Sequence, residues 1–254
     1  MEQSYVSICI PGYGPAYLTD TCLLTVHLTC TAGEVLIWDN GIDHQDLTNG
    51  DPVEETRLLD QIYARSEQGR LWAQGVWNLG FAEACNRMSQ EAKGELLVFL
   101  NCDTEPQPGW LEALVRAFDD PEVGVAGAML VGPEGDLFHA GVKVTIGNGL
   151  AWADDIREDL PTRDVAAVTG ACLAIRRTIF EELGGFDPGF WNLFEDIDLC
   201  LRVLQAGHRI RYIRESVVLH HMARSPERLN KAFHQVRYFQ EKWANATVVG
   251  SSIS

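Results

Sequence analysis

The chain has 254 residues, 46% of them hydrophobic and 22% charged, which is the composition of a soluble globular protein with enough chain for one large α/β domain. A formal net charge of −16 argues against a general nucleic-acid binder, because such binding begins with the neutralisation of phosphates. The sequence contains no apolar run of membrane-spanning length and no N-terminal secretory signal, so we expect a cytoplasmic protein.

Strands and helices are predicted to alternate along the first hundred residues. The predicted strands are short apolar runs: Val6–Pro11, Glu34–Asn40, Leu71–Val76 and Leu96–Leu100. The predicted helices between them are Ala16–Thr29, Glu55–Arg65 and Phe81–Ala92. This alternation indicates a parallel, doubly wound sheet, which binds ligands at the carboxyl edge of its strands. We therefore expect Tyr13, Asp39 and Asn78 to lie on the edge that also carries Asp103.

Two carboxylates, Asp103 and Glu105, follow directly after the apolar run Leu96–Leu100. Such an unbroken run is typical of a central strand that helices cover on both faces. The acids are thus placed where a hard divalent cation could be held, and carboxylate oxygens suit Mg²⁺ or Mn²⁺. The same acids could instead only solvate the turn before Pro106, and the spacing alone leaves both interpretations open.

The second half of the chain is predicted to be less regular. Its expected strands are Val123–Val131, Leu137–Ile146, Val165–Ile175, Arg209–Ile213 and Val217–Leu219. Its expected helices are Pro108–Asp119, Arg177–Leu183, Phe194–Ala206 and Glu227–Trp243. The polar segment Asn148–Asp164 is expected to be a mobile loop beside the site, because long connections without structure are usually functional or disordered. Gly170, inside a buried run, indicates a close approach of backbone or ligand.

The seven cysteines are an odd number and include no CxxC pair. Most of them lie inside apolar runs: Cys9, Cys85, Cys102, Cys172 and Cys200. We expect buried, reduced thiols without a chemical role.

Seven segments stand in a recognisable order from Val6 to about Ser225. They are VSICIPGYG at 6–14, WDNGID at 38–43, NLGFAEACN at 78–86, LLVFLNCDTEPQPGWL at 96–111, the region 120–141, VTGACLAIRRTIFEELGGFDPGFWNLFEDIDLCLR at 168–202, and LHH at 219–221. In this order they resemble a family-two glycosyltransferase of the GT-A fold, closest to the branch with rhamnosyl- and related transferases that build bacterial cell-surface glycans. No GxGxxG, P-loop or QxxRW motif is present, so dinucleotide binding, a P-loop and a processive membrane synthase have no support.

The resemblance implies one GT-A domain over 1–254, with a Rossmann-like, mostly parallel twisted sheet flanked by helices, a small antiparallel element and a C-terminal helix. Residues 1–105 would form the nucleotide-binding half, 106–245 the acceptor-binding half, and 246–254 a frayed tail. The implied activity is inverting, metal-dependent transfer of a hexosyl or deoxyhexosyl group from a nucleotide-diphosphate sugar to a glycan, lipid-linked or protein acceptor.

The resemblance also assigns roles to residues of this sequence. The residues implied to form the nucleotide-sugar site are Pro11, Tyr13, Asp39, Asn78, Gly80, Asn86, Asp103 and Gly170. Mn²⁺ or Mg²⁺ would be held by Asp103, Glu105 and His220, with Glu105 in the place of the commoner second Asp, so that direct and water-mediated binding are both open. Asp196 would be the catalytic base. Glu195 would hold the acceptor or raise the pKa of Asp196, and Trp191 could stack on an acceptor sugar.

Each of these roles has a plainer alternative. Glu195 and Asp196 could simply satisfy the start of a helix, and Asp198 with Arg202 fits an ordinary helical ion pair, which we take to be structural. His220 and His221 should point to opposite faces, so at most one faces a metal. The turn Gly12-Tyr13-Gly14 departs from the usual Thr-Tyr-Asn of the family, which affects the expected nucleoside contacts.

Two other functions stay open: a nucleotidyltransferase or metal-dependent phosphohydrolase, and a non-catalytic nucleotide-sugar-binding or assembly subunit. Residues 200–254 carry 9 Lys and Arg against 3 Asp and Glu. This basic segment could bring the protein to the inner face of the membrane through Arg224, Arg228 and Lys231, or could offset the acidic body.

Pocket loops such as 148–164 decide the donor sugar and the acceptor, and the sequence allows an oligomer.

Overall fold

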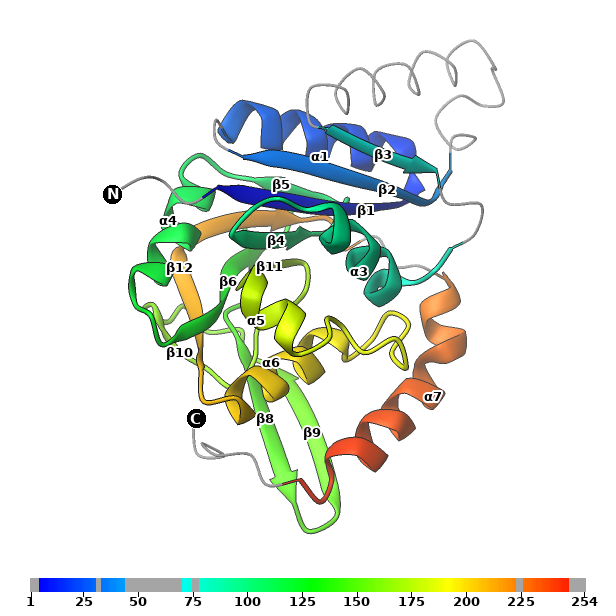
Figure 1. Ribbon diagram of the computed structural model, residues 1–254, viewed down its shortest axis with the longest axis vertical. Helices are drawn as coiled ribbons and strands as arrows, with labels where there is room; N and C mark the ends of the chain where they lie inside the picture. The colour runs from blue at the N-terminus through cyan, green and yellow to red at the C-terminus, as the bar shows by residue number, and fades with distance from the viewer. Residues whose placement is uncertain (1–4, 31–32, 44–69, 75–77, 223–225, 247–254) are drawn as a thin grey trace.

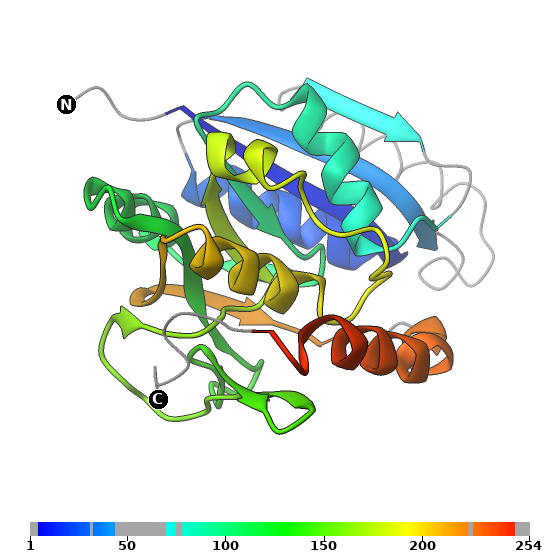
Figure 2. The ribbon, with the colours of Figure 1, turned by 60° about the horizontal axis from the view of Figure 1, so that its bottom comes forward.

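The computed structural model describes residues 5–30, 33–43, 70–74, 78–222 and 226–246. The predicted helix Glu55–Arg65 and most of the predicted tail 246–254 lie outside these ranges. The described chain forms one mixed sheet, which runs in the order β10-β12-β6-β11-β4-β1-β2-β3, and a separate two-stranded sheet of β8 and β9. Helices lie on both sides of the large sheet, which gives the three layers seen in Figures 1 and 2.

The bounds of the elements follow the predictions closely in the first half. The strands of the large sheet are β1 (Val6–Pro15), β2 (Glu34–Asp43), β3 (Arg70–Gln74), β4 (Leu96–Leu100), β5 (Thr104–Pro106), β6 (Val123–Val131), β7 (Leu137–His139), β10 (Arg163–Asp164), β11 (Cys172–Arg176) and β12 (Arg209–His220). The helices are α1 (Ala16–Thr29), α3 (Phe81–Glu91), α4 (Trp110–Arg116) with a 3₁₀ turn at Ala117–Asp119, α5 (Arg177–Glu182), α6 (Glu195–Gln205) and α7 (Pro226–Trp243).

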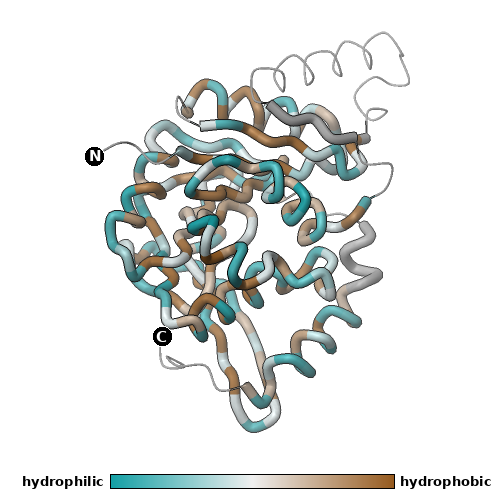
Figure 3. Tube along the Cα trace, in the orientation of Figure 1, coloured by the Kyte–Doolittle hydropathy of each residue, from teal (hydrophilic) through white to brown (hydrophobic). Residues whose placement is uncertain are grey.

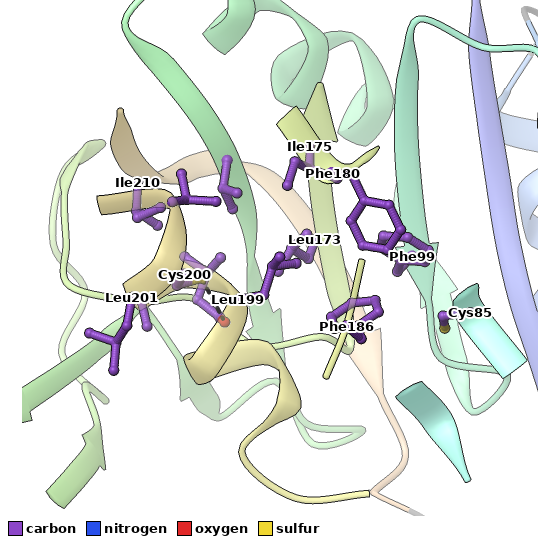
Figure 4. Packing of buried hydrophobic residues seen from close by; sticks show 14 of the residues in the cluster. Cys85, Phe99, Leu173, Ile175, Phe180, Phe186, Leu199, Cys200, Leu201 and Ile210 are labelled. Carbon is purple, nitrogen blue, oxygen red and sulfur yellow. Dashed lines mark hydrogen bonds between the residues drawn. The ribbon is translucent and has the colours of Figure 1, made fainter. Parts of the chain in front are cut away.

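Strand β4 is buried along its whole length, as its apolar run predicts. Leu97 and Phe99 point into the core under α3, α5 and α6, where Phe99 contacts Phe180 and Phe186 (Figure 4). Leu96, Val98 and Leu100 point to the opposite face, into the core under α1 and α4. Because successive side chains of a strand point to opposite faces of the sheet, β4 contributes side chains to both hydrophobic cores. The hydropathy tube shows the same apolar interior between more polar outer helices (Figure 3).

The second half corrects several predictions. The run Leu137–Ile146 is two strands: β7 pairs with β6, and the chain then leaves the sheet at Ala140-Gly141 to form β8 (Val142–Gly147). The segment Asn148–Asp164 is not an unstructured loop, because it contains β9 (Leu150–Asp155), which pairs antiparallel with β8.

Two further boundaries were wrong in the same half. Of the predicted strand Val165–Ile175, only the end is a strand, β11 (Cys172–Arg176). The two short strands predicted at 209–219 are a single strand, β12, whose pairing with β6 shifts register between Ile213 and Val217.

The cysteines behave as predicted. All seven lie in the described part of the chain, none forms a disulfide there, and six are buried. Burial raises the pKa of Cys102 and of Cys200 to about 12 and also holds the pKa of Cys85 well above its usual value, so these thiols stay protonated at neutral pH.

Helix α7 runs along the side of the molecule towards the β8–β9 hairpin (Figures 1 and 2). It is fastened by Asp198 of α6, which is fully buried. The Asp198 carboxylate accepts hydrogen bonds from Trp243 Nε1 at 2.9 Å and from Arg202 Nε at 2.8 Å, and it contacts Lys242 Nζ at 2.7 Å. The predicted structural role of Asp198 is therefore confirmed.

Replacing Asp198 should loosen α7 and destabilise the protein. We expect Asp198→Ala to lower the free energy of unfolding by about 3 kcal/mol or more, because it leaves the buried Trp243 indole N–H without its acceptor and removes the buried carboxylate that Arg202 and Lys242 contact. The matched control is Glu83→Ala, which removes the exposed Glu83–Arg87 pair of the equally long helix α3 and should cost less than about 0.5 kcal/mol. Denaturant unfolding measures both, and equal losses would contradict the anchoring role of Asp198.

Candidate active site

A pocket of about 550 Å³ opens at the carboxyl ends of β1, β2 and β4, a volume typical of small-molecule sites. Most of the residues predicted to form the site line it: Pro11, Tyr13, Asn78, Gly80, Asp103, Gly170, Glu195, Asp196 and His220. Within the described residues, the lining does not include the other predicted residues, Asp39, Asn86, Glu105 and Trp191. The pocket therefore joins residues from both halves of the chain.

The carboxyl ends of β1 and β4 are tied together beside the pocket. The Tyr13 backbone N–H donates to Cys102 Sγ, and the Cys102 thiol donates to the Tyr13 carbonyl, both at 3.3 Å. The unusual Gly12-Tyr13-Gly14 segment continues β1, with a register shift against β2. A Cβ atom on Gly12 would lie 2.7 Å from Ile42 Cδ1, so a larger residue there would require the Ile42 side chain to move.

Asp39 and its neighbour Asn40 have different tasks. The Asp39 carboxylate is buried and accepts hydrogen bonds from the Gly41 and Ile42 N–H groups at 3.0 and 2.9 Å. Asn40 lines the pocket, and its amide bridges to the next strand-to-helix turn, donating to the Gly80 carbonyl and accepting from the Leu79 N–H. Sequence reasoning missed Asn40, although strand alternation at the end of β2 places it opposite Asp39.

The turn Asn78-Leu79-Gly80 fixes the start of α3. Asn78 Oδ1 accepts from the Gly80 N–H at 2.9 Å. Gly80 has φ 79° and ψ 172°, a region that is essentially restricted to glycine. A Cβ atom there would lie 2.3 Å from the Trp191 carbonyl oxygen. Two chain segments that are distant in sequence thus meet at Gly80.

Asn86 and Trp191 hold the segment between α5 and α6 in place. Asn86 donates to the Phe186 carbonyl and accepts from the Phe186 N–H, both at 2.8 Å. The Trp191 carbonyl accepts from the Phe81 N–H at 2.8 Å, and its N–H donates to Gln235 of α7 at the same distance. Asn86 and Trp191 therefore support the pocket wall without being part of its described lining.

Asp196 lies in the first turn of α6, and its carboxylate is oriented by two backbone amides. Its Oδ1 accepts from the Ile197 N–H at 2.8 Å, which is the local helix-start interaction. Its Oδ2 accepts from the Gly170 N–H at 2.7 Å, across the pocket wall. A Cβ atom on Gly170 would lie 3.1 Å from the Phe81 ring and 3.4 Å from Asp196 Cβ, so glycine permits this close approach. Glu195 is buried beside it, with 6% of its surface exposed.

Two acid–histidine pairs lie where β5 meets the end of β12. Asp103 Oδ1 is 3.2 Å from His220 Nε2, and both residues line the pocket. Glu105 Oε1 is 2.6 Å from His221 Nε2, away from that lining. The structure thus brings together Asp103 and His220 as predicted, and it gives Glu105 a different partner. In the described part of the chain no three His, Cys, Asp or Glu side chains form a ready metal cluster.

The pocket is acidic. Its described lining contains four carboxylates, those of Asp103, Asp155, Glu195 and Asp196, and no Lys or Arg. An anionic ligand would need a cation beside these groups, because like charges repel strongly at short distance in a partly buried site.

Two solved structures share this architecture. A mannosyltransferase from Pyrobaculum calidifontis in complex with GDP-Man and Mn²⁺ has a TM-score of 0.68 at 16% identity, over 100% of this chain and 68% of that chain. GalNAc-T7 with UDP, GalNAc and Mn²⁺ has a TM-score of 0.62 at 17% identity, over 86% of this chain and 44% of that chain. At such identities the likeness concerns the fold alone. The fold is the GT-A fold of glycosyltransferases, and the predicted fold class is confirmed.

Residues 47–237, more than half of the chain, match the family model described as glycosyltransferase-like family 2. The chain belongs to this family. It is similar to the O-antigen biosynthesis protein RfbC of Myxococcus xanthus, with 39% identity over 55% of this chain and 12% of that protein. It is also similar to the N-acetylglucosaminyl-diphospho-decaprenol L-rhamnosyltransferase of Mycobacterium tuberculosis, with 28% identity over 76% of this chain and 68% of that protein, in agreement with the predicted branch.

The first two curated relatives are much longer than the region they share with this chain. The match spans 12% of the Myxococcus protein and 19% of the protein y4gI of Sinorhizobium fredii.

Gly80→Ala should disrupt the pocket. We expect a loss of about 3 kcal/mol or more in the free energy of unfolding, because the glycine-only backbone region and the contact with the Trp191 carbonyl both act against a side chain. Gly109→Ala is the control, since Gly109 also has a positive φ of 85° but open space around its Cβ position, and it should lose only about 1 kcal/mol. Equal losses in denaturant unfolding would show that the contact with Trp191 has no energetic weight.

Proposed function

We propose that this chain is an inverting, metal-dependent glycosyltransferase, which moves a hexosyl or deoxyhexosyl group from a nucleotide-diphosphate sugar to an acceptor hydroxyl in glycan biosynthesis. One observation carries the proposal: Asp103 with His220, and Asp196 with Gly170, face the same pocket. The first pair comes from the carboxyl edge of the sheet, and the second joins the turn before β11 to the first turn of α6. Donor and acceptor residues of such a reaction must meet in this way.

The residues fit a divalent cation. Two donor atoms bonded at about 2.1 Å and at right angles to one cation lie about 3 Å apart. Asp103 Oδ1 and His220 Nε2 are separated by 3.2 Å. Mn²⁺ or Mg²⁺ held by Asp103 and His220 would act as a Lewis acid and offset the charge of the departing diphosphate. Glu105 would join the site through water, since its carboxylate contacts His221.

Asp196 is the group that we assign as the base. The amides of Gly170 and Ile197 each occupy one of its carboxylate oxygens and fix their direction. Each oxygen has a second lone pair, which can accept the proton of the attacking hydroxyl. A positioned base of this kind contributes about 10²- to 10⁴-fold to the rate. Attack on the face opposite the diphosphate gives inversion at the anomeric carbon.

We assign the donor to the half 1–105, through Pro11, Tyr13, Asp39, Asn78, Gly80 and Asn86. We assign the acceptor to the half 106–245, through Glu195, with Trp191 supporting the pocket wall behind it. Pro11, Tyr13, Asn78 and Gly80 would contact the nucleotide sugar directly, and Asp39 and Asn86 would shape its site. The Mycobacterium relative is named for a lipid-linked acceptor, which supports a lipid-linked acceptor here.

Peripheral membrane contact remains a proposal for this chain. The described basic residues after residue 200 pair with acids: Arg202, Arg209, Arg211, Arg214, Arg237 and Lys242. These residues therefore offset the acidic body of the protein. Membrane contact would rest on Arg224, Arg228 and Lys231, whose side chains lie outside the described part. No helix in the described part is long and apolar enough to cross a bilayer.

The proposal is tested by a donor screen. Purified protein with Mn²⁺ or Mg²⁺ is offered UDP-, dTDP- and GDP-sugars, and thermal shift and nucleotide diphosphate release are measured with and without EDTA. We expect one donor to raise the Tm in a metal-dependent way, because a ligand that binds only the folded state stabilises it. The anomeric configuration of the product, read by NMR, tests inversion. A folded protein that no donor stabilises would favour an assembly subunit instead.

Asp196→Asn separates a transferase from a binding module. We expect transfer to fall by about 10²-fold or more, because an amide cannot take up the hydroxyl proton. The donor-induced shift in Tm should remain, because the substituted side chain keeps an oxygen for the Gly170 N–H. Unchanged transfer would remove Asp196 as the base.

Asp103→Asn and Glu105→Gln test the two acid–histidine pairs against each other. Asp103→Asn should weaken Mn²⁺ binding, measured by calorimetry in the presence of the donor nucleotide, by about 100-fold or more, since it loses a direct charged ligand, whereas loss of an outer-shell partner costs about 10- to 100-fold. Glu105→Gln should weaken it less, because the proposed contact passes through water. A greater loss from Glu105→Gln would make Glu105 the direct ligand and Asp103 the secondary one.

A further inference from the structure

A further carboxylate faces the pocket from outside the predicted motifs. Asp155 is the last residue of β9, in the separate two-stranded sheet. Ala153 and Asp155 both line the pocket, whereas Trp152 and Asp154 lie on the other face of the strand and hydrogen-bond to each other at 2.8 Å. Strand alternation therefore directs Asp155, and not the neighbouring Asp154, towards the site.

His139 holds this carboxylate from behind. The ring of His139 is buried, with 1% of its surface exposed, and bridges two walls of the pocket. Its Nε2 is 3.3 Å from the Thr169 backbone nitrogen, and its Nδ1 is 3.3 Å from Asp155 Oδ1. Because a backbone N–H can only donate, Nε2 is the acceptor; in the neutral ring Nδ1 then carries the proton and donates it to Asp155.

The backbone around Asp155 is fixed as well. The residue that follows, Ile156, accepts a hydrogen bond from the Ala140 N–H at 2.7 Å and donates one to the Gly141 carbonyl at 2.9 Å. The end of β9 is thereby fastened to the link between β7 and β8. The Asp155 side chain itself is 41% exposed, and its other oxygen lies 3.8 Å from the exposed Arg157 guanidinium. One oxygen is thus held firmly while the carboxylate stays accessible from the pocket.

Asp155 and Asp196 are both positioned by the segment Thr169-Gly170, Asp155 through His139 and Asp196 directly. His139 bonds Thr169, and the next residue, Gly170, donates its N–H to Asp196. A group that is fixed relative to the base is well placed to orient the molecule whose hydroxyl the base must reach. An ionised carboxylate only accepts hydrogen bonds, so its partner must be a donor, and the donors that every neutral sugar offers are its hydroxyl groups.

We propose that Asp155 binds a hydroxyl group of the acceptor sugar and that His139 is the positioning residue that aims it. This inference rests on the proposed glycosyltransferase function and adds a specificity-determining contact to it. Asp155 would select acceptors by a second hydroxyl, distinct from the one that attacks.

The test uses the full chain, the donor found in the screen, Mn²⁺, and four p-nitrophenyl glycosides as acceptor probes, those of glucose, galactose, N-acetylglucosamine and rhamnose. We expect Asp155→Ala to raise the acceptor KM by about 10- to 100-fold, the loss of one hydrogen bond to a charged group, with kcat and the donor KM within about twofold. Asp154→Ala is the matched control on the opposite face of β9 and should leave the acceptor KM unchanged.

His139 is tested by rescue and by additivity. His139→Ala should raise the acceptor KM, whereas His139→Asn should restore it, because the Asn amide can donate from the position of Nδ1. In the double variant Asp155→Ala/His139→Ala the acceptor KM should be no higher than in Asp155→Ala alone, since His139 acts through Asp155. The donor-induced shift in Tm shows for each variant that the protein is folded.

The outcomes separate this inference from the proposed function. An unchanged acceptor KM in Asp155→Ala, or an equal rise in Asp154→Ala, would overturn the role of Asp155. Transfer to none of the four glycosides by the wild-type protein, with donor binding intact, would overturn the proposed class of acceptor contact and leave the transferase site standing. A wild-type protein that binds no donor would overturn the proposed function itself.

Discussion

The antiparallel pairing of β11 with β4 is the constraint on which the site depends. Cys172 faces Leu100 in this register, and the Asn101 N–H donates to the Ala171 carbonyl at 3.0 Å just beyond it. The turn before β11 therefore lies beside the turn after β4, which carries Asp103. Gly170 in turn holds Asp196 of α6. The backbone hydrogen bonds between β11 and β4 thus set the separation between Asp103 and Asp196, the two carboxylates of the proposed reaction. A register shift of one residue would turn every side chain of β11 to the opposite face of the sheet.

The sequence predicted the bounds of the regular helices and strands. It did not predict the bounds of elements that depend on tertiary contacts. Helix α1 and strands β4 and β6 have the predicted bounds, because burial on one or both faces leaves a plain periodicity. The run Leu137–Ile146 looked continuous, yet Gly141 takes a φ of 103° and directs the chain from the large sheet into the β8–β9 hairpin. Strand β9 was read as a loop because its acids and exposed Leu150 and Trp152 mask the alternation.

The same distinction applies to the site. Motif order located Asp103, Asp196 and His220 on one pocket, since Asp103 and His220 lie at recognisable strand ends and Asp196 lies at a recognisable helix start. It could not tell which of two neighbours faces inward, so Asn40 was missed beside Asp39. It also could not show that Glu105 would have His221 as its partner, because that contact depends on how β5 pairs with β12. The segment that contains Asp155 was expected beside the site, but as a loop, so no strand alternation singled out Asp155.

The helix-start role and the catalytic role that were weighed for the Glu195-Asp196 pair are compatible with one arrangement of Asp196. Asp196 does bond its own helix, through the Ile197 N–H, which is one of the N–H groups of the first turn that have no partner within the helix. That local bond fixes one oxygen, and the Gly170 amide fixes the other from the facing wall. A carboxylate that is held at two points by rigid backbone loses little further freedom when a hydroxyl arrives, and preorganisation of this kind is what a base requires. The helix start therefore supplies the orientation on which the proposed chemistry depends.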